Sequence, residues 1–462
     1  MNQEDALRSE IHQALDPVTT PTPELLPGIV QRLRPVSRRR PYFVIGQVAA
    51  VVGILIVGAV VLSIHRSRVT PGPVTTSPTA PIVAGPGANI AWVTSQTTSG
   101  GFYSGDIVTG IDPTGHVVGR INVRDELRSP DGSHLYALVD GGVDVYSTVD
   151  GHKEQTIRLE PVTFGEPMLS ADGRYLAVVG SSPSPLQLVD LSAGQSVASI
   201  NVDSPAYGVP LIVGAHAEHV YVVGATIAKF AFDSATLRLE QRTTGHTLAC
   251  DGLVLGGANS SGGLPFRVLA DDRTLVAFCP SDGRVTWFDL VAMTVTHEVV
   301  VPQNNPFWLS PVFSTDGNTL YLHEGGTGAL HMVDLVHQAI RSTKVAAADT
   351  NPLAWLGSLL VTEAYAGGIP RTTAVSPDGN WLYAVGGFRA SGVTVVHLPD
   401  LGVKGRWLPD VSLHSVWVSA DGRTIYLLEN DDQLRVLRTD GSVIAKVALP
   451  ANTDTFIVPT IP

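Results

Sequence analysis

Short stretches of alternating apolar and polar residues follow one another from about residue 89 to the end of the chain. Each stretch has the two-residue period of a half-buried β-strand, and clusters of glycine, proline, serine and aspartate separate one stretch from the next. Clear examples are 89–93, 186–190, 285–289 and 329–334. The pattern predicts an all-β domain of many short strands.

A phrase recurs among these strands, a serine, any residue and Asp-Gly, followed by an aliphatic residue that usually precedes a tyrosine. The five clear copies begin at Ser129, Ser170, Ser314, Ser376 and Ser419. Two weaker copies fill the gaps at positions 214 and 269, so seven copies recur at intervals of 41 to 62 residues. Asp-Gly supplies the positive φ of a tight turn, and repeats of this length are typical of a β-propeller. The aspartates are therefore expected to form turns rather than to act in catalysis.

The two ends of the propeller sequence complement each other. Segment 89–123 supplies only three strands of a four-stranded unit, and the innermost strand is missing. The sequence from Thr455 to Val458 lies where the next repeat would place that strand. Pairing one strand from each end would close the ring and remove exposed sheet edges. The count then favours eight four-stranded blades, and seven stays open if the weak repeat near 207–263 is only partly formed.

The repeat resembles the YVTN-type family of bacterial β-propellers, which is related to WD40-like and lactonase-type propellers. The Ser-Pro-Asp-Gly-x-x-Leu-Tyr phrases at 129–136 and 376–383 and the V-x-V-x-D-like strands carry this resemblance, which covers about 129–448. The asparagine that commonly follows the Tyr-Val strand is mostly replaced, by Asp140, Gly180, His323 and Gly386. The resemblance implies the fold, but such propellers include binding modules, surface-layer components and a few enzymes, so it implies no single function.

An apolar run precedes the propeller. Phe43 to Ile64 contains 22 residues without a charge, with Gln47 and Ser63 as its only polar side chains. A helix of this length reaches roughly 33 Å, enough to cross a hydrocarbon core of about 30 Å. A cleaved signal peptide fits less well, because about 40 residues precede the run and no small-x-small site follows it. The run predicts a single transmembrane helix within 41–65.

Flanking charge predicts the orientation of this helix. Five arginines lie between residues 32 and 40, against Arg66 and Arg68 after the helix. The positive-inside rule then places a short basic arm, 1–40, in the cytoplasm. A Pro/Thr-rich stalk, 66–88, would lift the propeller, 89–462, off the outer surface of the cell membrane. The bilayer is thus a predicted partner through residues 43–64.

Charge also limits the class of partner. Residues 1–68 hold eight basic and five acidic residues, net +3, and the remaining 22 basic and 37 acidic residues give −15; together these make the chain's −12. A domain with this charge is a poor nucleic-acid binder, so no nucleic-acid partner is expected.

Motifs that carry chemistry are scarce. The sequence has no C-x-x-C, H-x-H, H-E-x-x-H or G-x-S-x-G and no Gly-rich phosphate loop, so it predicts no catalytic residue, metal site or cofactor. His323-Glu324 is the nearest approach to a ligand pair. The two cysteines, Cys250 and Cys279, would lie outside the membrane, where they could form a disulfide or remain buried thiols.

Long connections are the best candidates for a binding surface. If every Ser-x-Asp-Gly turn lies on one face of the ring, the connections 95–105, 243–263, 323–328, 346–370 and 386–392 all emerge on the other. Aromatic and charged side chains on such a face are typical of recognition. The candidate binding residues are Phe102, Tyr103, His323, Glu324, Tyr365, Phe388 and Arg389. Alternatively, 346–370 packs onto the propeller as a cap.

Together these features favour a membrane-tethered, extracytoplasmic propeller that binds a protein or small-molecule ligand, as a sensor or an assembly scaffold would. An enzyme is less favoured than a binding module. The alternative is a propeller hydrolase of the lactonase type, which the resemblance permits and no motif demands.

Overall fold

The structure of the chain is a computed structural model. It describes residues 83–99, 102–160, 166–179, 185–202, 209–213, 218–223, 226–233, 235–243, 266–279, 283–302, 309–324, 329–344, 373–385 and 391–459. The predicted arm, transmembrane helix and most of the stalk lie outside these residues. Within them, no helix is both long enough and apolar enough to span a bilayer.

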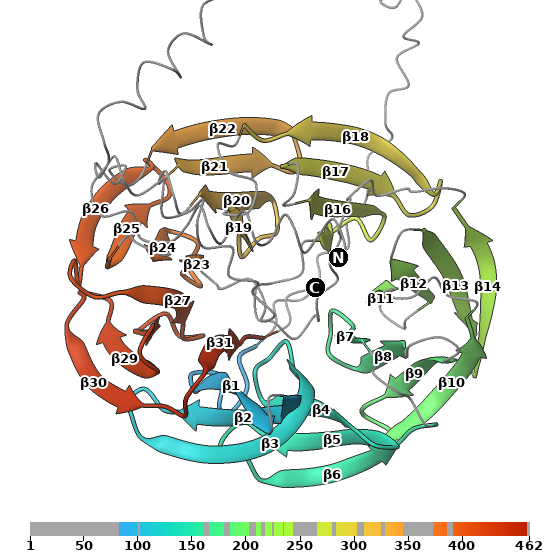
Figure 1. The fold of residues 1–462 in the computed structure, drawn as a ribbon. Coiled ribbons are helices and arrows are strands. Elements are labelled where there is room, and N and C mark those ends of the chain that lie inside the picture. Colours follow the sequence, from blue (N-terminus) through green and yellow to red (C-terminus); the bar gives the residue numbers. More distant parts are fainter. Residues whose placement is uncertain are drawn as a thin grey trace, which may run out of the picture. The chain divides into compact units, whose positions relative to one another are not determined.

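The described residues form an eight-bladed β-propeller (Figure 1). Each blade is an antiparallel sheet of four strands, which we call A to D from the centre of the ring outward. Strand β3 (Val117–Arg128) is long and serves twice, because it pairs with β2 as strand D of the first blade and with β4 as strand A of the second. The weak repeat near 207–263 forms a complete fourth blade, so the count is eight rather than seven.

The remaining strands follow in chain order. Blades 1 and 2 contain, besides β3, β31 (Thr453–Ile457), β1 (Ala91–Ser99), β2 (Phe102–Ile111), β4 (His134–Val139), β5 (Gly142–Ser147) and β6 (Lys153–Arg158). Blades 3 and 4 contain β7 (Glu166–Leu169), β8 (Tyr175–Val179), β9 (Pro185–Asp190), β10 (Gln195–Asn201), β11 (Val209–Val213), β12 (His219–Val223), β13 (Ile227–Asp233) and β14 (Thr236–Arg242).

The second half of the ring has the same arrangement. Blades 5 and 6 contain β15 (Phe266–Val268), β16 (Thr274–Cys279), β17 (Arg284–Asp289), β18 (Thr294–Val300), β19 (Leu309–Phe313), β20 (Thr319–Glu324), β21 (Ala329–Asp334) and β22 (Ala339–Lys344). Blades 7 and 8 contain β23 (Thr373–Val375), β24 (Trp381–Val385), β25 (Val393–His397), β26 (Gly402–Trp407), β27 (Leu413–Val418), β28 (Thr424–Glu429), β29 (Gln433–Arg438) and β30 (Val443–Ala448).

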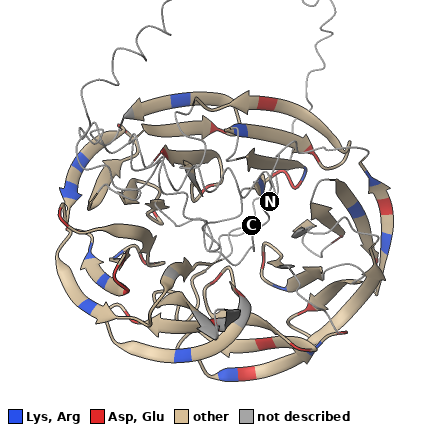
Figure 2. Cartoon of the chain, viewed as in Figure 1, with Lys and Arg blue, Asp and Glu red and all other residues tan. Residues whose placement is uncertain are grey.

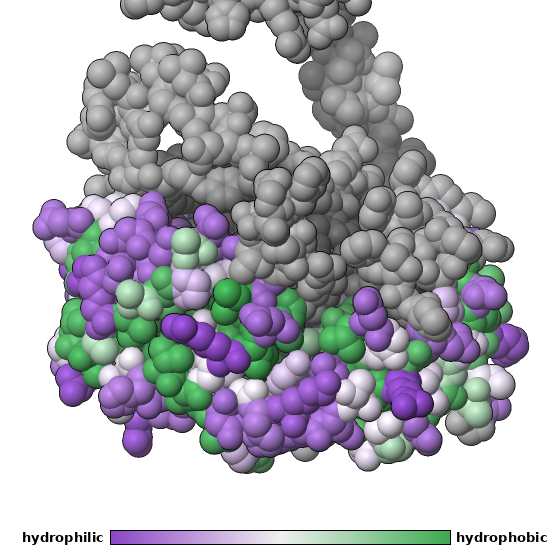
Figure 3. All heavy atoms as spheres, turned by 60° about the horizontal axis from the view of Figure 1, so that its bottom comes forward, coloured by the Kyte–Doolittle hydropathy of each residue, from purple (hydrophilic) through white to green (hydrophobic). Residues whose placement is uncertain are grey.

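Burial follows the position of a strand in its blade. Every residue of the B strands β8 and β28 is buried, whereas the D strands β6 and β18 are mostly exposed. Charged residues accordingly gather on the outer strands and the turns (Figure 2), and polar and apolar side chains mix along the outer wall (Figure 3). Inner strands are covered on both faces by neighbouring blades, which explains their nearly continuous apolar runs.

Apolar contact between blades holds the ring together. The buried apolar side chains form eight clusters in the described residues, and each cluster joins one blade to the next. A fully buried aliphatic or aromatic side chain contributes about 1.5 to 3 kcal/mol, so these interfaces dominate the stability of the fold. Because each blade is apolar on both faces, the fold needs a closed ring.

Closure occurs between the two ends of the propeller sequence, as predicted. β31 pairs antiparallel with β1, with Trp92 opposite Ile457 and Val93 opposite Phe456. Trp92 and Phe456 are completely buried, and the Trp92 indole donates a hydrogen bond to the Thr148 carbonyl in blade 2 at 3.1 Å. The C-terminal strand therefore completes blade 1 and fills the apolar layers on both sides of it.

The Ser-x-Asp-Gly phrase forms the A–B turn, again as predicted. In all five clear copies the serine hydroxyl donates to the aspartate at 2.5 to 2.7 Å. The same hydroxyl accepts from the backbone N–H five residues later at 2.8 to 3.0 Å. The glycines have φ between 69° and 76°, which is the left-handed region. Each residue type of the phrase is thus required by the turn itself.

The copy in blade 5 keeps the turn without its glycine. Asp272 occupies the glycine position with φ 51°, and its N–H still donates to the Leu269 carbonyl at 3.0 Å. Burial, and then the carboxylates of Asp271 and Glu218, raise the pKa of Asp272. Asp272 therefore destabilises the folded state in two ways, because a non-glycine residue adopts a left-handed backbone conformation and because its carboxylate is partly buried beside other carboxylates.

We predict that deleting residues 453–462 abolishes cooperative unfolding of the full chain. The deletion removes β31, uncovers the edge of β1 and opens the apolar layers around Phe456. Calorimetry or far-UV circular dichroism of the purified protein checks this, with deletion of 460–462 as a control that leaves β31 intact. A normal, cooperative melt of the longer deletion would contradict the role of β31.

We predict that Asp272→Gly stabilises the protein by about 0.5 to 1 kcal/mol at neutral pH, because it relieves a left-handed non-glycine residue. Because the folded-state pKa of Asp272 is raised, protonated Asp272 favours the folded state. This contribution to stability is lost as pH rises through that pKa and the carboxylate becomes charged. The increase in the free energy of unfolding caused by Asp272→Gly should therefore be larger at pH 7 than at pH 3.5, as measured by denaturant titration. The reverse change in blade 8, Gly422→Asp, is the matched control and should destabilise; no gain from Asp272→Gly would contradict the argument.

Candidate functional site

The ring has two different faces. The A–B turns and C–D turns lie on one face, the turn face, and the B–C and D–A connections lie on the other, the loop face. On the turn face, Arg174 at the A–B turn of blade 3 bonds to Asp190 at the end of strand C at 2.9 Å, and Arg273 and Asp289 repeat this pair in blade 5 at 2.6 Å. These ion pairs tie the two turns of a blade together.

The segment that enters the propeller is fixed to the turn face. The Gly85 N–H donates to the Asp131 carbonyl at 2.7 Å, and the Arg128 guanidinium donates to the Gly87 carbonyl at 2.9 Å. The Tyr426 hydroxyl donates to the Asn89 carbonyl at 2.7 Å. Residues 85–89 thus contact the A strand and A–B turn of blade 2 and the B strand of blade 8.

Two predicted site residues, Phe102 and Tyr103, lie in a strand rather than in a loop. The prediction of a loop over 95–105 is wrong, because β1 continues to Ser99 and β2 begins at Phe102. The two strands pair along their whole length, with Thr98 opposite Tyr103 and Ser99 opposite Phe102. Gly-Gly between two β-forming runs is a known signal for a two-residue hairpin loop, and it stands here at 100–101. The hairpin ends on the loop face.

His323 and Glu324 also lie in a strand, so the predicted loop start at His323 is wrong. They are the last residues of β20, and their side chains are 3% and 0% exposed. Burial, with a smaller contribution from His331, lowers the pKa of His323 to about 4 against the opposing effect of Glu324. Both residues belong to the blade interior next to the loop face, and the imidazole of His323 is neutral at physiological pH.

The remaining predicted residues are three binding residues and the two cysteines. Tyr365, Phe388 and Arg389 lie outside the described residues, so their part in binding stays a prediction. Cys279 ends β16, is 1% exposed and is disulfide-bonded. Its predicted partner, Cys250, lies outside the described residues, and the pairing itself stays a prediction.

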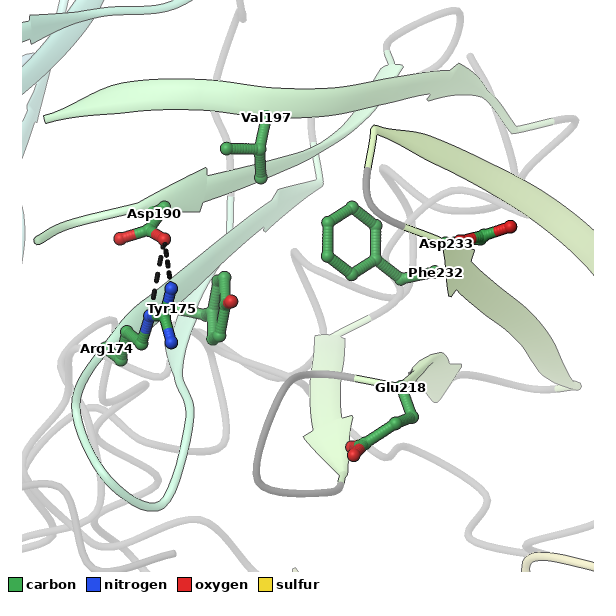
Figure 4. A pocket seen from close by; sticks show the side chains of 7 residues that line it. All are labelled: Arg174, Tyr175, Asp190, Val197, Glu218, Phe232 and Asp233. Atoms are coloured by element: carbon green, nitrogen blue, oxygen red, sulfur yellow. Dashed lines mark hydrogen bonds and ion pairs between the residues drawn. The ribbon is translucent and has the colours of Figure 1, made fainter. Parts of the chain in front are cut away.

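A pocket of about 350 Å³ opens between blades 3 and 4 on the turn face (Figure 4). Its walls are Arg174, Tyr175, Asp190, Val197, Glu218, Phe232 and Asp233. The rings of Tyr175 and Phe232 face each other edge-on, with centroids 6.3 Å apart and planes at 66°. The Arg174 guanidinium lies 4.9 Å from the Tyr175 ring centre while it pairs with Asp190.

The pocket lies where blade 4 departs from the repeat. In blades 3, 5, 6 and 7, a buried leucine donates its N–H from the C–D turn to the A–B turn, as Leu290 does to Arg273. In blade 4 the corresponding bond runs from Phe232 to the Glu218 carbonyl at 3.0 Å, and the Phe232 side chain is only partly buried. Glu218 stands where blades 3 and 5 have arginine, and Ala231 stands where they have aspartate. These two residues therefore cannot form the ion pair that ties the turns elsewhere.

The described walls of the pocket carry charged side chains of both signs. Among the described residues that line it, Asp190, Glu218 and Asp233 are acidic, and Arg174, which pairs with Asp190, is basic. Partial burial alone would raise the pKa of Asp190, but hydrogen bonds from Ser192 and Arg174 hold it below its usual range, so this group is ionised at neutral pH.

Sequence reasoning missed this pocket. It treated the blade 4 repeat as a weak copy of the turn phrase, and it placed the binding surface on the opposite face. A comparison of the repeats position by position would have shown that Glu218, Ala231 and Phe232 replace arginine, aspartate and leucine.

The comparisons with known proteins support the propeller fold. No protein-family model and no curated protein matches the sequence. Among solved structures, the chain is similar to the dihydro-heme d1 dehydrogenase NirN in complex with DHE, with a TM-score of 0.55, 14% identity and coverage of 84% of this chain and 78% of that one. It is also similar to BamB from Moraxella catarrhalis, with a TM-score of 0.45, 14% identity and coverage of 70% and 88%. At these identities the likeness to NirN shows a shared propeller fold and nothing finer.

Proposed function

We propose that the chain is a binding module, a propeller held outside the cell membrane by an N-terminal helix, that recognises a protein or small-molecule ligand through its loop face. The attachment of residues 85–89 to the turn face carries the proposal. A tether that joins the ring on the turn face leaves the opposite face free to meet a partner.

The contrast between the two faces supports the same assignment. The Ser-x-Asp-Gly turns repeat the same hydrogen bonds in five of the blades. The D–A connections are not repeated: the one from β14 to β15 spans 243–265 and the one from β22 to β23 spans 345–372, against four residues from β30 to β31. A specific partner needs a surface that differs from blade to blade, and non-repeating connections on a rigid scaffold supply one.

The topology can be tested by labelling single cysteines in the full chain. We predict that an impermeant maleimide labels Asp440→Cys, an exposed turn-face position, in intact spheroplasts, and labels Gln13→Cys only after lysis. The expectation rests on five arginines before the apolar run and two after it. Labelling of Gln13→Cys before lysis, or protection of Asp440→Cys, would reverse the orientation.

The binding face can be tested by photo-crosslinking. We predict that a photoreactive residue at Asp410 or Asp431, exposed positions on the loop-face connections, forms discrete adducts in native membranes. The same residue at Asp378 or Arg423 on the turn face should form none, and these positions are the matched controls. Adducts confined to the turn face would refute the proposal.

A captured partner then allows a quantitative test of the predicted residues. Alanine at Tyr365 or Arg389 should weaken its binding by about 1 to 2 kcal/mol, as anchor residues do. Asp378→Ala should lower the melting temperature and leave the affinity of the folded protein unchanged. The alternative function, a lactonase-type hydrolase, predicts instead that the purified chain opens a lactone substrate.

A further inference from the structure

Two histidines of blade 2 converge on one carboxylate at the turn face. The Nε2 atom of His134, at the start of β4, lies 3.3 Å from Oε2 of Glu154 in β6, and Nε2 of His152, directly before β6, lies 3.9 Å from Oε1 of the same side chain. We propose that these three residues bind a divalent transition-metal ion such as Zn²⁺, with water in the fourth position. The proposal does not rest on the loop-face function, because the residues lie on the opposite face.

The hydrogen bonds behind the two imidazoles direct their lone pairs at Glu154. Ser133 Oγ donates to the Asp131 carboxylate at 2.8 Å, so it accepts a hydrogen bond from Nδ1 of His134 at 2.6 Å. Nδ1 of His152 donates to the Asp150 carboxylate, also at 2.6 Å. A proton on Nδ1 leaves the lone pair on Nε2. Histidines that bind metals usually donate their other ring N–H to a partner in this way.

A cation between these groups would balance them. With the proton on Nδ1, the Nε2 lone pair of His134 faces a carboxylate oxygen of Glu154 at 3.3 Å, and two acceptors repel each other. Lys153, which lies between His152 and Glu154 in the sequence, is paired with Asp144 at 2.7 Å. A proton would bridge only one histidine to Glu154, whereas a metal ion would join all three side chains.

This arrangement differs from the other histidine–carboxylate pairs. Elsewhere on the described turn face, a carboxylate contacts at most one histidine. These single pairs are His116–Asp112, His219–Glu240, His337–Asp334 and His397–Asp400. Convergence of two Nε2 atoms on one carboxylate is therefore particular to blade 2.

The spacing approaches that of a zinc site and requires one movement. In a tetrahedral site with bonds of about 2.0 Å, neighbouring ligand atoms are about 3.3 Å apart, which is the distance between His134 and Glu154. The contact of His152 is longer, and no group of three His, Cys, Asp or Glu side chains among the described residues is already arranged to hold a metal. Binding must therefore draw in His152, whose side chain is 59% exposed and can rotate.

A metal here would take the place of an ion pair that blade 2 lacks. The strand register places Ser133 and Ser147 of blade 2 where blade 3 has Arg174 and Asp190. Two serines cannot form the ion pair that ties the A–B turn to the C–D turn. A metal held by His134 on one side and by His152 and Glu154 on the other would join the same two elements of the blade.

The experiment is isothermal titration of the untagged, chelator-treated full chain in detergent micelles with ZnCl₂ and with MgCl₂. We expect saturable binding of zinc and none of magnesium, because imidazole ligands suit zinc and magnesium prefers oxygen ligands. His152→Gln and Glu154→Gln should each weaken zinc binding at least ten-fold. The matched control is His337→Gln, which removes an exposed histidine paired with a single carboxylate and should leave the affinity unchanged.

A second measurement separates loss of the site from loss of the fold. The substituted side chains are 35% and 59% exposed, so the metal-free variants should melt like the metal-free parent chain in circular dichroism. Co²⁺ should give the visible absorption of a tetrahedral site in the parent chain and in His337→Gln, but not in Glu154→Gln. The proposal fails if zinc does not bind saturably, if magnesium binds equally well, or if Glu154→Gln and His337→Gln bind zinc alike.

Discussion

The pairing of β31 with β1 is the constraint on which the rest of the structure depends. Each blade is apolar on both faces, so an open row of eight blades would leave two apolar faces and two sheet edges in water. The strand from Thr453 to Ile457 removes both problems at once, because it completes blade 1 and places Phe456 against blade 8 and Ile457 against blade 2. Every interface in the ring is therefore satisfied only when the two ends of the propeller meet.

Arg128 strengthens this closure from within. Its side chain is fully buried in blade 2, lies 5.3 Å from the Trp417 ring centre in blade 8 and donates to the Gly87 carbonyl in the entering segment. Its backbone also forms an isolated bridge with Pro459 just beyond β31. Burial lowers the pKa of Arg128 to about 9, so the guanidinium remains charged at neutral pH. A buried cation is retained at a cost in desolvation, and here it joins the chain on both sides of the closure.

Much of the fold could be predicted from the sequence because each residue type in the repeated phrase is required by one kind of turn. The serine, aspartate and glycine of each phrase have separate roles in one turn, and their recurrence fixed the propeller, the A–B turns and the closing strand. The predictions failed where they depended on how far a strand continues. Ser95 to Ser99 and His323 to Glu324 are polar, and a polar run was interpreted as a loop. Pairing with β2, and burial between strands β19 and β21, kept these residues in strands, and neither effect is visible in a local pattern.

Differences between repeats matter more for function here than the repeats themselves. The Ser-x-Asp-Gly turn recurs in five blades and serves the fold, because the carboxylate of Asp378 and of its counterparts accepts hydrogen bonds within the turn itself. Blade 4 keeps the backbone bond of the turn, from Phe232 to Glu218, but loses the aspartate, the arginine and the buried leucine that accompany it. Blade 4 therefore lacks the ion pair of blades 3 and 5 and buries less apolar surface at this position, and the pocket lined by Tyr175 and Phe232 lies here. Because the repeated turns are explained by folding, a place where the repeat departs and a pocket opens is more informative about a function specific to one blade than the repeated residues are.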